Sequence, residues 1–217
     1  MSEAPAPVHN PNLRHHFTEM EQQVDAGKLG MWLFLVTEML LFGGLFVGFG
    51  LMAGKHQAAF HAARAHLDRT LGTLNTVVLL VSSFTMVMAV LSARENRRKA
   101  LVAFLIATLL LAGVFLGVKY FEYSHKFHEG LLPGKYYSHQ GDTVPGQGMF
   151  FSFYFMLTGL HGIHILGGMS VMLWLLRRSL RGDFSSGYYA PVDYVGLYWH
   201  LVDIIWIYLF PLLYLIG

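Results

Sequence analysis

The chain has 217 residues, a formal net charge of +2 and no cysteine, which excludes disulfides, iron–sulfur clusters and thiol catalysis. Hydrophobic residues make up 54% of it and charged residues 13%, a composition typical of an integral membrane protein and not of a soluble globule. The basic residues are scattered among the polar stretches, so nucleic-acid binding has no support.

The first 28 residues are polar and lack the apolar centre of a signal peptide, so we interpret residues 1–28 as a solvated cytoplasmic tail with a short helix around residues 17–24. Five apolar segments follow, each near the roughly 20 residues that a membrane span requires. They are residues 29–52, 71–92, 100–120, 150–176 and 194–216. Because backbone groups in lipid must be satisfied within the chain, spans of this length should be helical. The sequence therefore predicts an all-α membrane protein, a bundle of five transmembrane helices.

The distribution of Lys and Arg predicts the orientation. Nine of the 15 fall on the side that holds the tail and the loops after the second and fourth spans. An excess of basic residues marks the cytoplasmic side, so we expect the N-terminus in the cytoplasm and the C-terminus outside. The long segment 121–147 then faces the outside, and its Pro and Gly residues favour a folded-back loop over a further helix.

Ionisable residues inside three spans are the candidate functional groups. Glu38 lies within the first span, His161 and His164 within the fourth, and His200 and Asp203 within the fifth. The last two pairs are each three residues apart, so each pair lies on one helix face. At 1.5 Å per residue, all but His161 can share one layer in the inner half of the bilayer. Such groups should face the protein interior and pair with one another.

A hydrogen-bond network between helices is the favoured interpretation of these His and Asp residues. For Glu38 a structural and a functional role are equally open, because no neighbour in its span neutralises it. A bis-His haem between His164 and His200, or a metal site from Glu38 and the histidines, is a sharper alternative with less support.

Two further patterns have structural explanations. Lys119 and Glu122, at the end of the third span, are expected to form an interfacial ion pair with snorkelling stems and little energetic value. Glycines are expected to allow close helix packing in two spans. They are Gly43, Gly44 and Gly48, and Gly159, Gly162, Gly167 and Gly168.

Several segments of the predicted spans resemble one known family, subunit III of haem–copper oxidases. Residues 153–168, FYFMLTGLHGIHILGG, are similar to its TGxHGxHV segment, and residues 196–206, GLYWHLVDIIW, to its YWHFVDVVW segment. Residues 37–42, TEMLLF, resemble the family's SEVLFF segment with an intramembrane Glu. Residues 74–80 and 121–123 resemble its LNTxxLL and SEYY segments. The matches occur in order from about residue 29 to residue 217.

The resemblance implies an accessory subunit of a cytochrome c oxidase in the bacterial inner membrane, with no catalytic residue, cofactor or metal on this chain. Haem and copper are expected in partner subunits. Subunit III packs on subunit I, which reduces oxygen and pumps protons, alongside subunit II and possibly a small subunit IV. It binds phospholipid in a cleft between its helices, sustains proton uptake and protects the enzyme during turnover.

Carried over by position, Glu38 is the family's buried carboxylate. His161, His164, His200 and Asp203 are the polar residues of its last two helices, and Glu122 is its helix-end glutamate. The long form of the family has seven helices, of which this chain matches the last five, so the lipid cleft formed with the first two is an open question here.

Several functions stay open at this point. Five-helix forms also occur in quinol oxidases and beside nitric-oxide reductases, which leaves the electron donor and the acceptor undecided. A stand-alone proton-coupled transporter would show internal repeats or broken helices, and the sequence has neither. A b-type haem anchor is the remaining alternative.

Overall fold

The computed structural model describes residues 13–15, 17–133, 136–138 and 144–215. Its helices are, in chain order, α1 (Met20–Lys55), α2 (Gln57–Arg64), α3 (Arg69–Arg94), α4 (Arg98–His128), α5 (Gln147–Arg181), α6 (Ala190–Phe210) and the π-helix η2 (Pro211–Leu215). Five of them, counting α6 with η2 as one, are long and apolar enough to cross a membrane. The predicted five-helix membrane bundle is confirmed, and the predicted orientation of the termini stays a prediction.

Several helices are longer than the apolar segments from which they were predicted. Helix α1 already begins at Met20, within the predicted tail, and α4 continues to His128, so residues 121–128 are helix and not loop. The short helix α2 was not predicted in the polar segment between the first two spans. A helix can continue through polar residues beyond its apolar segment, because its backbone hydrogen bonds do not depend on hydropathy. Hydropathy alone therefore does not show where these helices end. Gly134, in the long loop, and Ile216, at the predicted end of the fifth span, lie outside the described residues.

Helix ends follow local chemistry. Asp68 caps α3, its Oδ1 accepting from the backbone N–H of Thr70 at 2.8 Å and of Leu71 at 3.2 Å. Gly146 and Gly182 flank α5 with φ of +98° and +86°, a left-handed conformation that glycine adopts without a steric penalty.

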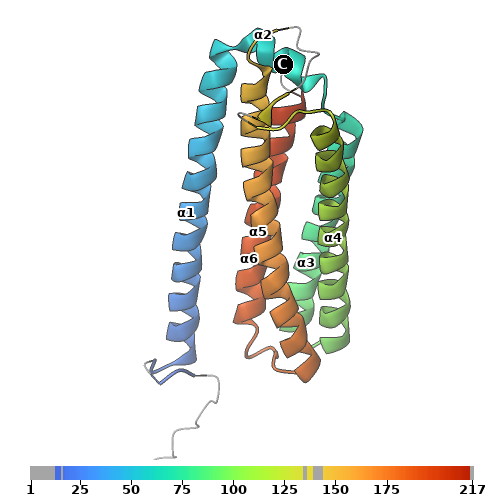
Figure 1. The fold of residues 1–217 in the computed structure, drawn as a ribbon. Helices are drawn as coiled ribbons and strands as arrows, with labels where there is room; N and C mark the ends of the chain where they lie inside the picture. Colours follow the sequence, from blue (N-terminus) through green and yellow to red (C-terminus); the bar gives the residue numbers. More distant parts are fainter. Residues whose placement is uncertain (1–12, 16, 134–135, 139–143, 216–217) are drawn as a thin grey trace, which may run out of the picture.

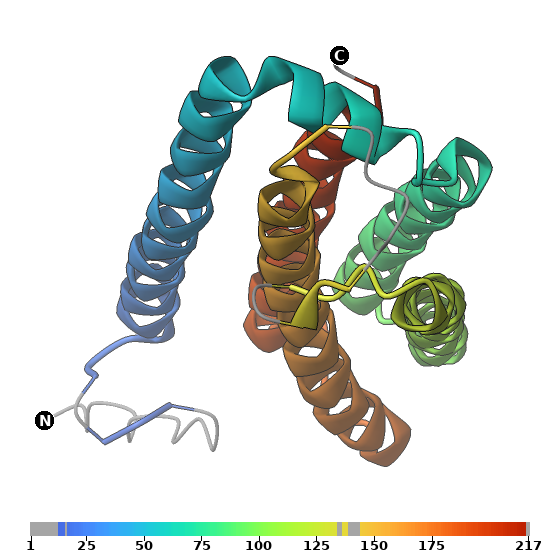
Figure 2. The ribbon, with the colours of Figure 1, turned by 45° about the horizontal axis from the view of Figure 1, so that its top comes forward.

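Helix α1 stands apart from the other spans, whereas α6 lies among them (Figure 1). Within the apolar window of each span, 17% of residues are buried in α1 and 56% in α6. Figure 2 shows α2 crossing from the end of α1 toward α3, over the ends of α5 and α6. The bundle is therefore α3 to α6, with α1 attached at its side.

Aromatic rings join α1 to the bundle at the end where α2 lies. The ring centroid of Phe60 on α2 lies 5.3 Å from that of Phe49 on α1 and 5.5 Å from that of Phe150 on α5. All three side chains are buried, and edge-to-face rings at this spacing attract one another. At the opposite end, the Tyr194 hydroxyl donates to the backbone oxygen of Val24, 2.8 Å away, which fixes the start of α1 against α6.

A buried ion pair fixes the end of the bundle near η2. Lys119 and Glu122 are only 7% and 4% exposed, and Lys119 Nζ donates to Glu122 Oε2 at 2.8 Å. The Tyr214 hydroxyl accepts from Lys119 at 2.8 Å and donates to Glu122 Oε1 at 2.6 Å. Tyr154 donates to the same oxygen at 2.9 Å. The ion pair was predicted, but the snorkelling stems expected for it were wrong, because Tyr154 of α5 and Tyr214 of η2 cover it. Its depth in the membrane stays a prediction.

The glycines differ in their surroundings. A Cβ on Gly168 would stand 2.8 Å from the Trp199 ring, so this glycine allows the close contact of α5 with α6. At Gly162, Gly43 and Gly44 no atom of a neighbouring element lies within 4 Å of a Cβ. The close-packing interpretation is therefore confirmed at Gly168, whereas among the described residues no other helix of this chain packs on these three positions.

Gly168→Ala should destabilise the bundle by about 1–3 kcal/mol, because the new methyl group overpacks against Trp199. Gly162→Ala, on the same helix, is the matched control and should stay within about 1 kcal/mol of the parent, with helix propensity favouring alanine. Thermal unfolding of the full chain in mild detergent measures both. Equal effects of the two substitutions would contradict the packing role of Gly168.

Lys119→Met should cost about 3–5 kcal/mol, because it leaves the Glu122 carboxylate buried without its cation. The double variant Lys119→Met/Glu122→Leu removes both charges and should recover most of that loss. The two variants and the parent are compared by thermal unfolding in the same detergent. A loss below about 1 kcal/mol for Lys119→Met would restore the snorkelling interpretation, since exposed pairs contribute about that much.

Candidate functional site: polar groups within the spans

Glu38 and His164 meet between α1 and α5. Glu38 Oε2 lies 2.7 Å from His164 Nε2, and the side chains are 15% and 13% exposed. The buried ring of Phe42 packs edge-on against the imidazole, with centroids 5.1 Å apart. The neutralising partner of Glu38 that its own span lacks is thus supplied by another helix, 126 residues further along the chain.

The second ring nitrogen of His164 determines what this pair can hold. His164 Nδ1 lies 2.8 Å from the backbone oxygen of Leu160, and because a carbonyl oxygen only accepts, Nδ1 carries a hydrogen. The 2.7 Å contact at Nε2 then needs one more proton, either on the imidazole or on the carboxyl group. The pair is therefore a one-proton site whose net charge is zero with the proton on either partner.

His200 and Asp203 form a separate group between α6 and α3. His200 Nδ1 lies 2.7 Å from the Ser83 hydroxyl. Asp203 is 3% exposed, and among the described residues neither of its oxygens has a hydrogen bond of normal geometry, although Ser83 faces it. The predicted pairing of the inner-layer groups is thus confirmed for Glu38 with His164, but His200 bonds a serine instead of another member of the layer.

His161 is isolated from both groups. It is fully buried, and its two ring nitrogens lack a hydrogen-bond partner in the described part of the chain. Its ring packs against Phe115 and Trp206, with centroids 5.5 and 5.2 Å apart. Their spacing along α5 predicted that His161 and His164 share one helix face. In the structure His161 contacts α4 and α6, whereas the His164 side chain contacts α1.

His164 has no free ring nitrogen for a haem iron, because Nδ1 bonds the backbone oxygen of Leu160 and Nε2 bonds Glu38. Across residues 13–15, 17–133, 136–138 and 144–215, no group of three or more His, Asp or Glu side chains is arranged to hold a metal ion. What these side chains can do is hold and exchange a proton and tie helices together.

Sequence reasoning missed the partners of these groups. Ser83 is an ordinary hydroxyl in a span, and Tyr154 and Tyr214 are ordinary aromatic residues in two others. Lys126 was also missed, although it is 1% exposed and donates to the backbone oxygen of His66 at 2.8 Å. The available signal was that Lys119 and Lys126 flank Glu122 on α4: seven residues are about two helical turns, so the two cations lie on one face.

The comparisons with known proteins agree with the resemblance. The sequence model of the family described as cytochrome c oxidase subunit III matches residues 12–217. Probable quinol oxidase subunit 3 of Staphylococcus saprophyticus is 31% identical over 210 residues, covering 94% of this chain and 98% of the relative. Proteins of the same name from Staphylococcus aureus strain USA300 and Staphylococcus epidermidis are each 32% identical, covering 89% of this chain and 90% of the relative.

A family match over nearly the whole chain and five membrane spans confirm the resemblance read from the helix motifs. The chain belongs to the subunit III family of haem–copper oxidases, as a multi-pass protein of the bacterial inner membrane that associates with other oxidase subunits such as subunit I.

Proposed function

We propose that this chain is the non-redox accessory subunit of a proton-pumping terminal oxidase. It packs on subunit I beside subunit II, and possibly a small subunit IV, binds phospholipid, and supports proton uptake and turnover stability. Haem and copper reside in the partner subunits. The observation that carries the proposal is the Glu38–His164 pair, a one-proton site between two spans of a chain whose family associates with oxidases.

The pair suits proton uptake for a physical reason. Moving the proton between carboxyl group and imidazole changes no net charge, so it avoids the cost of an isolated charge in lipid. Both side chains keep a small exposed surface, through which a partner subunit packed on this part of the spans can reach the proton.

Quinol is the proposed electron donor of the complex. The support is that the relatives from three Staphylococcus species, at 31–32% identity, are named probable quinol oxidase subunit 3. Cytochrome c is the second candidate, because the matching family bears the name of cytochrome c oxidase.

Purification of the tagged chain in mild detergent should bring two larger subunits with haem and copper, visible in an optical spectrum. The purified complex should consume oxygen when a quinol is supplied as electron donor. Oxygen consumption with reduced cytochrome c and none with quinol would identify cytochrome c as the donor instead. Haem b without copper would indicate a nitric-oxide reductase partner. Recovery of the colourless chain alone would contradict the subunit proposal.

Glu38→Gln should leave assembly intact and reduce both proton uptake and the number of turnovers before inactivation, because glutamine cannot hold the shared proton. Its effect on stability should be about 1 kcal/mol or less, as for other polar contacts between membrane helices. His164→Gln should have the same effect, and the double variant should lose no more than either single one, since both act through one site.

Glu95→Gln is the matched control for this series, because Glu95 is an exposed glutamate that pairs with Arg97 outside the spans. Proton uptake and catalytic lifetime are measured on the assembled complexes reconstituted in vesicles. Wild-type values for both quantities in Glu38→Gln would exclude a part for this pair in proton uptake.

A further inference from the structure

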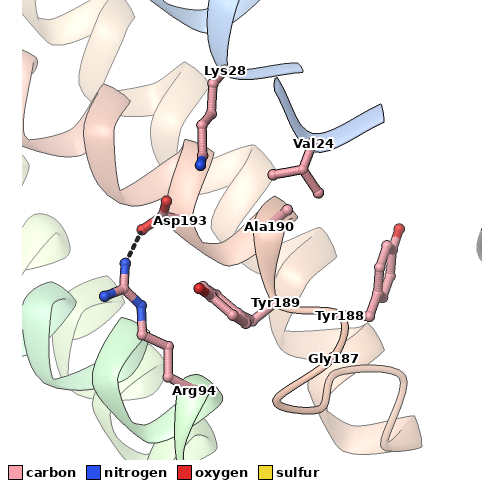
Figure 3. Close-up of a pocket in the computed structure, with 8 residues that line it drawn as sticks. All are labelled: Val24, Lys28, Arg94, Gly187, Tyr188, Tyr189, Ala190 and Asp193. Carbon is pink, nitrogen blue, oxygen red and sulfur yellow. Dashed lines mark hydrogen bonds and ion pairs between the residues drawn. The ribbon is translucent and has the colours of Figure 1, made fainter. Parts of the chain in front are cut away.

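A polar cavity lies where α1 begins, between α1, the last turn of α3 and the start of α6 (Figure 3). Its volume is about 140 Å³. Four side chains with donor groups line it, Lys28 of α1, Arg94 of α3, and Tyr188 and Tyr189, which precede α6. Figure 3 shows the Lys28 side chain extending from α1 into this space, toward Asp193 and Arg94.

The lining carries an excess of positive charge. Arg94 donates through one nitrogen to Asp193 Oδ1 at 3.1 Å, and its guanidinium lies 5.1 Å from the centroid of the Tyr189 ring. The pair leaves further guanidinium N–H groups available. Lys28 has only a loose pair with Asp25, at 3.9 Å between solvent-exposed side chains. Within the lining, two cations therefore face the single carboxylate of Asp193, an excess of one positive charge, while Asp25 lies outside the lining.

An apolar groove continues from this cavity into the membrane-spanning part of the bundle. A second cavity, of about 160 Å³, shares Arg94 and Asp193 with the first. Its lining is mostly apolar and comes from α3 and α6, namely Val87, Val90, Leu91, Gly196 and Leu197, and His200 of α6 is its one further polar side chain. From Arg94 to Val87 the groove follows α3 for about 10 Å, at 1.5 Å per residue. This is about two thirds of the depth of one leaflet's hydrocarbon layer.

We propose that the two connected cavities bind one anionic phospholipid. Lys28, Arg94 and the Tyr189 hydroxyl hold its phosphate, and one acyl chain lies in the groove between α3 and α6. The single negative charge of the phosphate balances the excess in the lining. A headgroup that also carries an ammonium group would be disfavoured beside Lys28 and Arg94. A free phosphate would account for the charged cavity but not for the apolar groove that opens from it.

The site also fits its surroundings. Most Lys and Arg of the chain are at this end of the spans, where they attract anionic lipid to the membrane surface. The inference rests on the lipid binding included in the proposed function and names its place and its headgroup class. A lipid bound there would join α1 to α3 and α6 near the Tyr194–Val24 hydrogen bond.

The test uses the whole complex, stripped of lipid in detergent and titrated with phosphatidylglycerol or phosphatidylcholine. Native mass spectrometry measures the bound lipid. Lys28→Gln/Arg94→Gln should weaken phosphatidylglycerol binding by about tenfold or more, the effect of removing two basic contacts near a membrane surface. Arg97→Gln/Lys99→Gln removes the same charge from the same end outside the cavity and is the matched control, with an expected change below about threefold.

A second variant tests the groove without altering any charge. Val87 is 41% exposed, so Val87→Trp should fold normally, fill the groove and weaken phosphatidylglycerol binding while leaving the binding of inorganic phosphate unchanged. Partner subunits that co-purify and an unchanged melting temperature verify its assembly.

Each other outcome overturns the assignment. Wild-type binding in both variants would mean that lipid binds elsewhere, and equal losses in the control would mean non-specific attraction. If Lys28→Gln/Arg94→Gln lost the binding of inorganic phosphate while Val87→Trp left lipid binding unchanged, the cavity would be a site for a free anion. If the parent complex held no lipid of either kind, the lipid binding in the proposed function would itself fail.

Discussion

The requirement that polar groups in lipid find partners within the protein determines how this chain is built. Helix α1 depends on it most, because few of its residues are buried in the bundle. Contacts along its length hold α1, among them the Tyr194–Val24 hydrogen bond at its start, the Glu38–His164 pair within the span, and the aromatic contacts of Phe49 at its far end. Only the middle contact contains a proton that can move, so the same contact both positions α1 and provides the candidate chemistry.

Two largely buried carboxylates that have partners, Glu122 and Glu38, meet the requirement in different ways, whereas Asp203 has no hydrogen bond of normal geometry among the described residues. Glu122 accepts from Lys119, Tyr154 and Tyr214, so it has a permanent cation and two hydroxyl donors. These three donors stabilise the ionised carboxylate, and its burial leaves little surface through which a proton could enter. Glu122 is therefore a structural residue. Glu38 has one partner, itself titratable, and some exposed surface. Of the two, only Glu38 has the properties of a group that exchanges protons.

The sequence predicts those features that depend on one helix at a time. Hydropathy identifies five spans, and the helix period places His200 and Asp203 on one face. The sequence also places Glu38 and His164 in one layer of groups expected to pair, but it could not say which members would meet, or that Ser83 would bond His200, because such contacts depend on how helices pack. Lys119 and Glu122 were placed at the interface because the apolar run ends at residue 120. Their burial depends on Tyr214, 95 residues after Lys119, in a π-helix that no local pattern indicates.

The attachment of α1 explains why a lipid site at its start has mechanical consequences. A phosphate between Lys28 and Arg94 would bridge α1 to the bundle at the end where one hydrogen bond to Tyr194 now does so. Any change in the tilt of α1 that this bridge limits would otherwise alter the 2.7 Å contact between Glu38 and His164 further along the same helix. Under the proposed function that contact contains the exchangeable proton, so a lipid at the rim would be coupled to proton uptake in the span through one helix. Loss of the lipid would then impair proton uptake without any change in the residues that hold the proton.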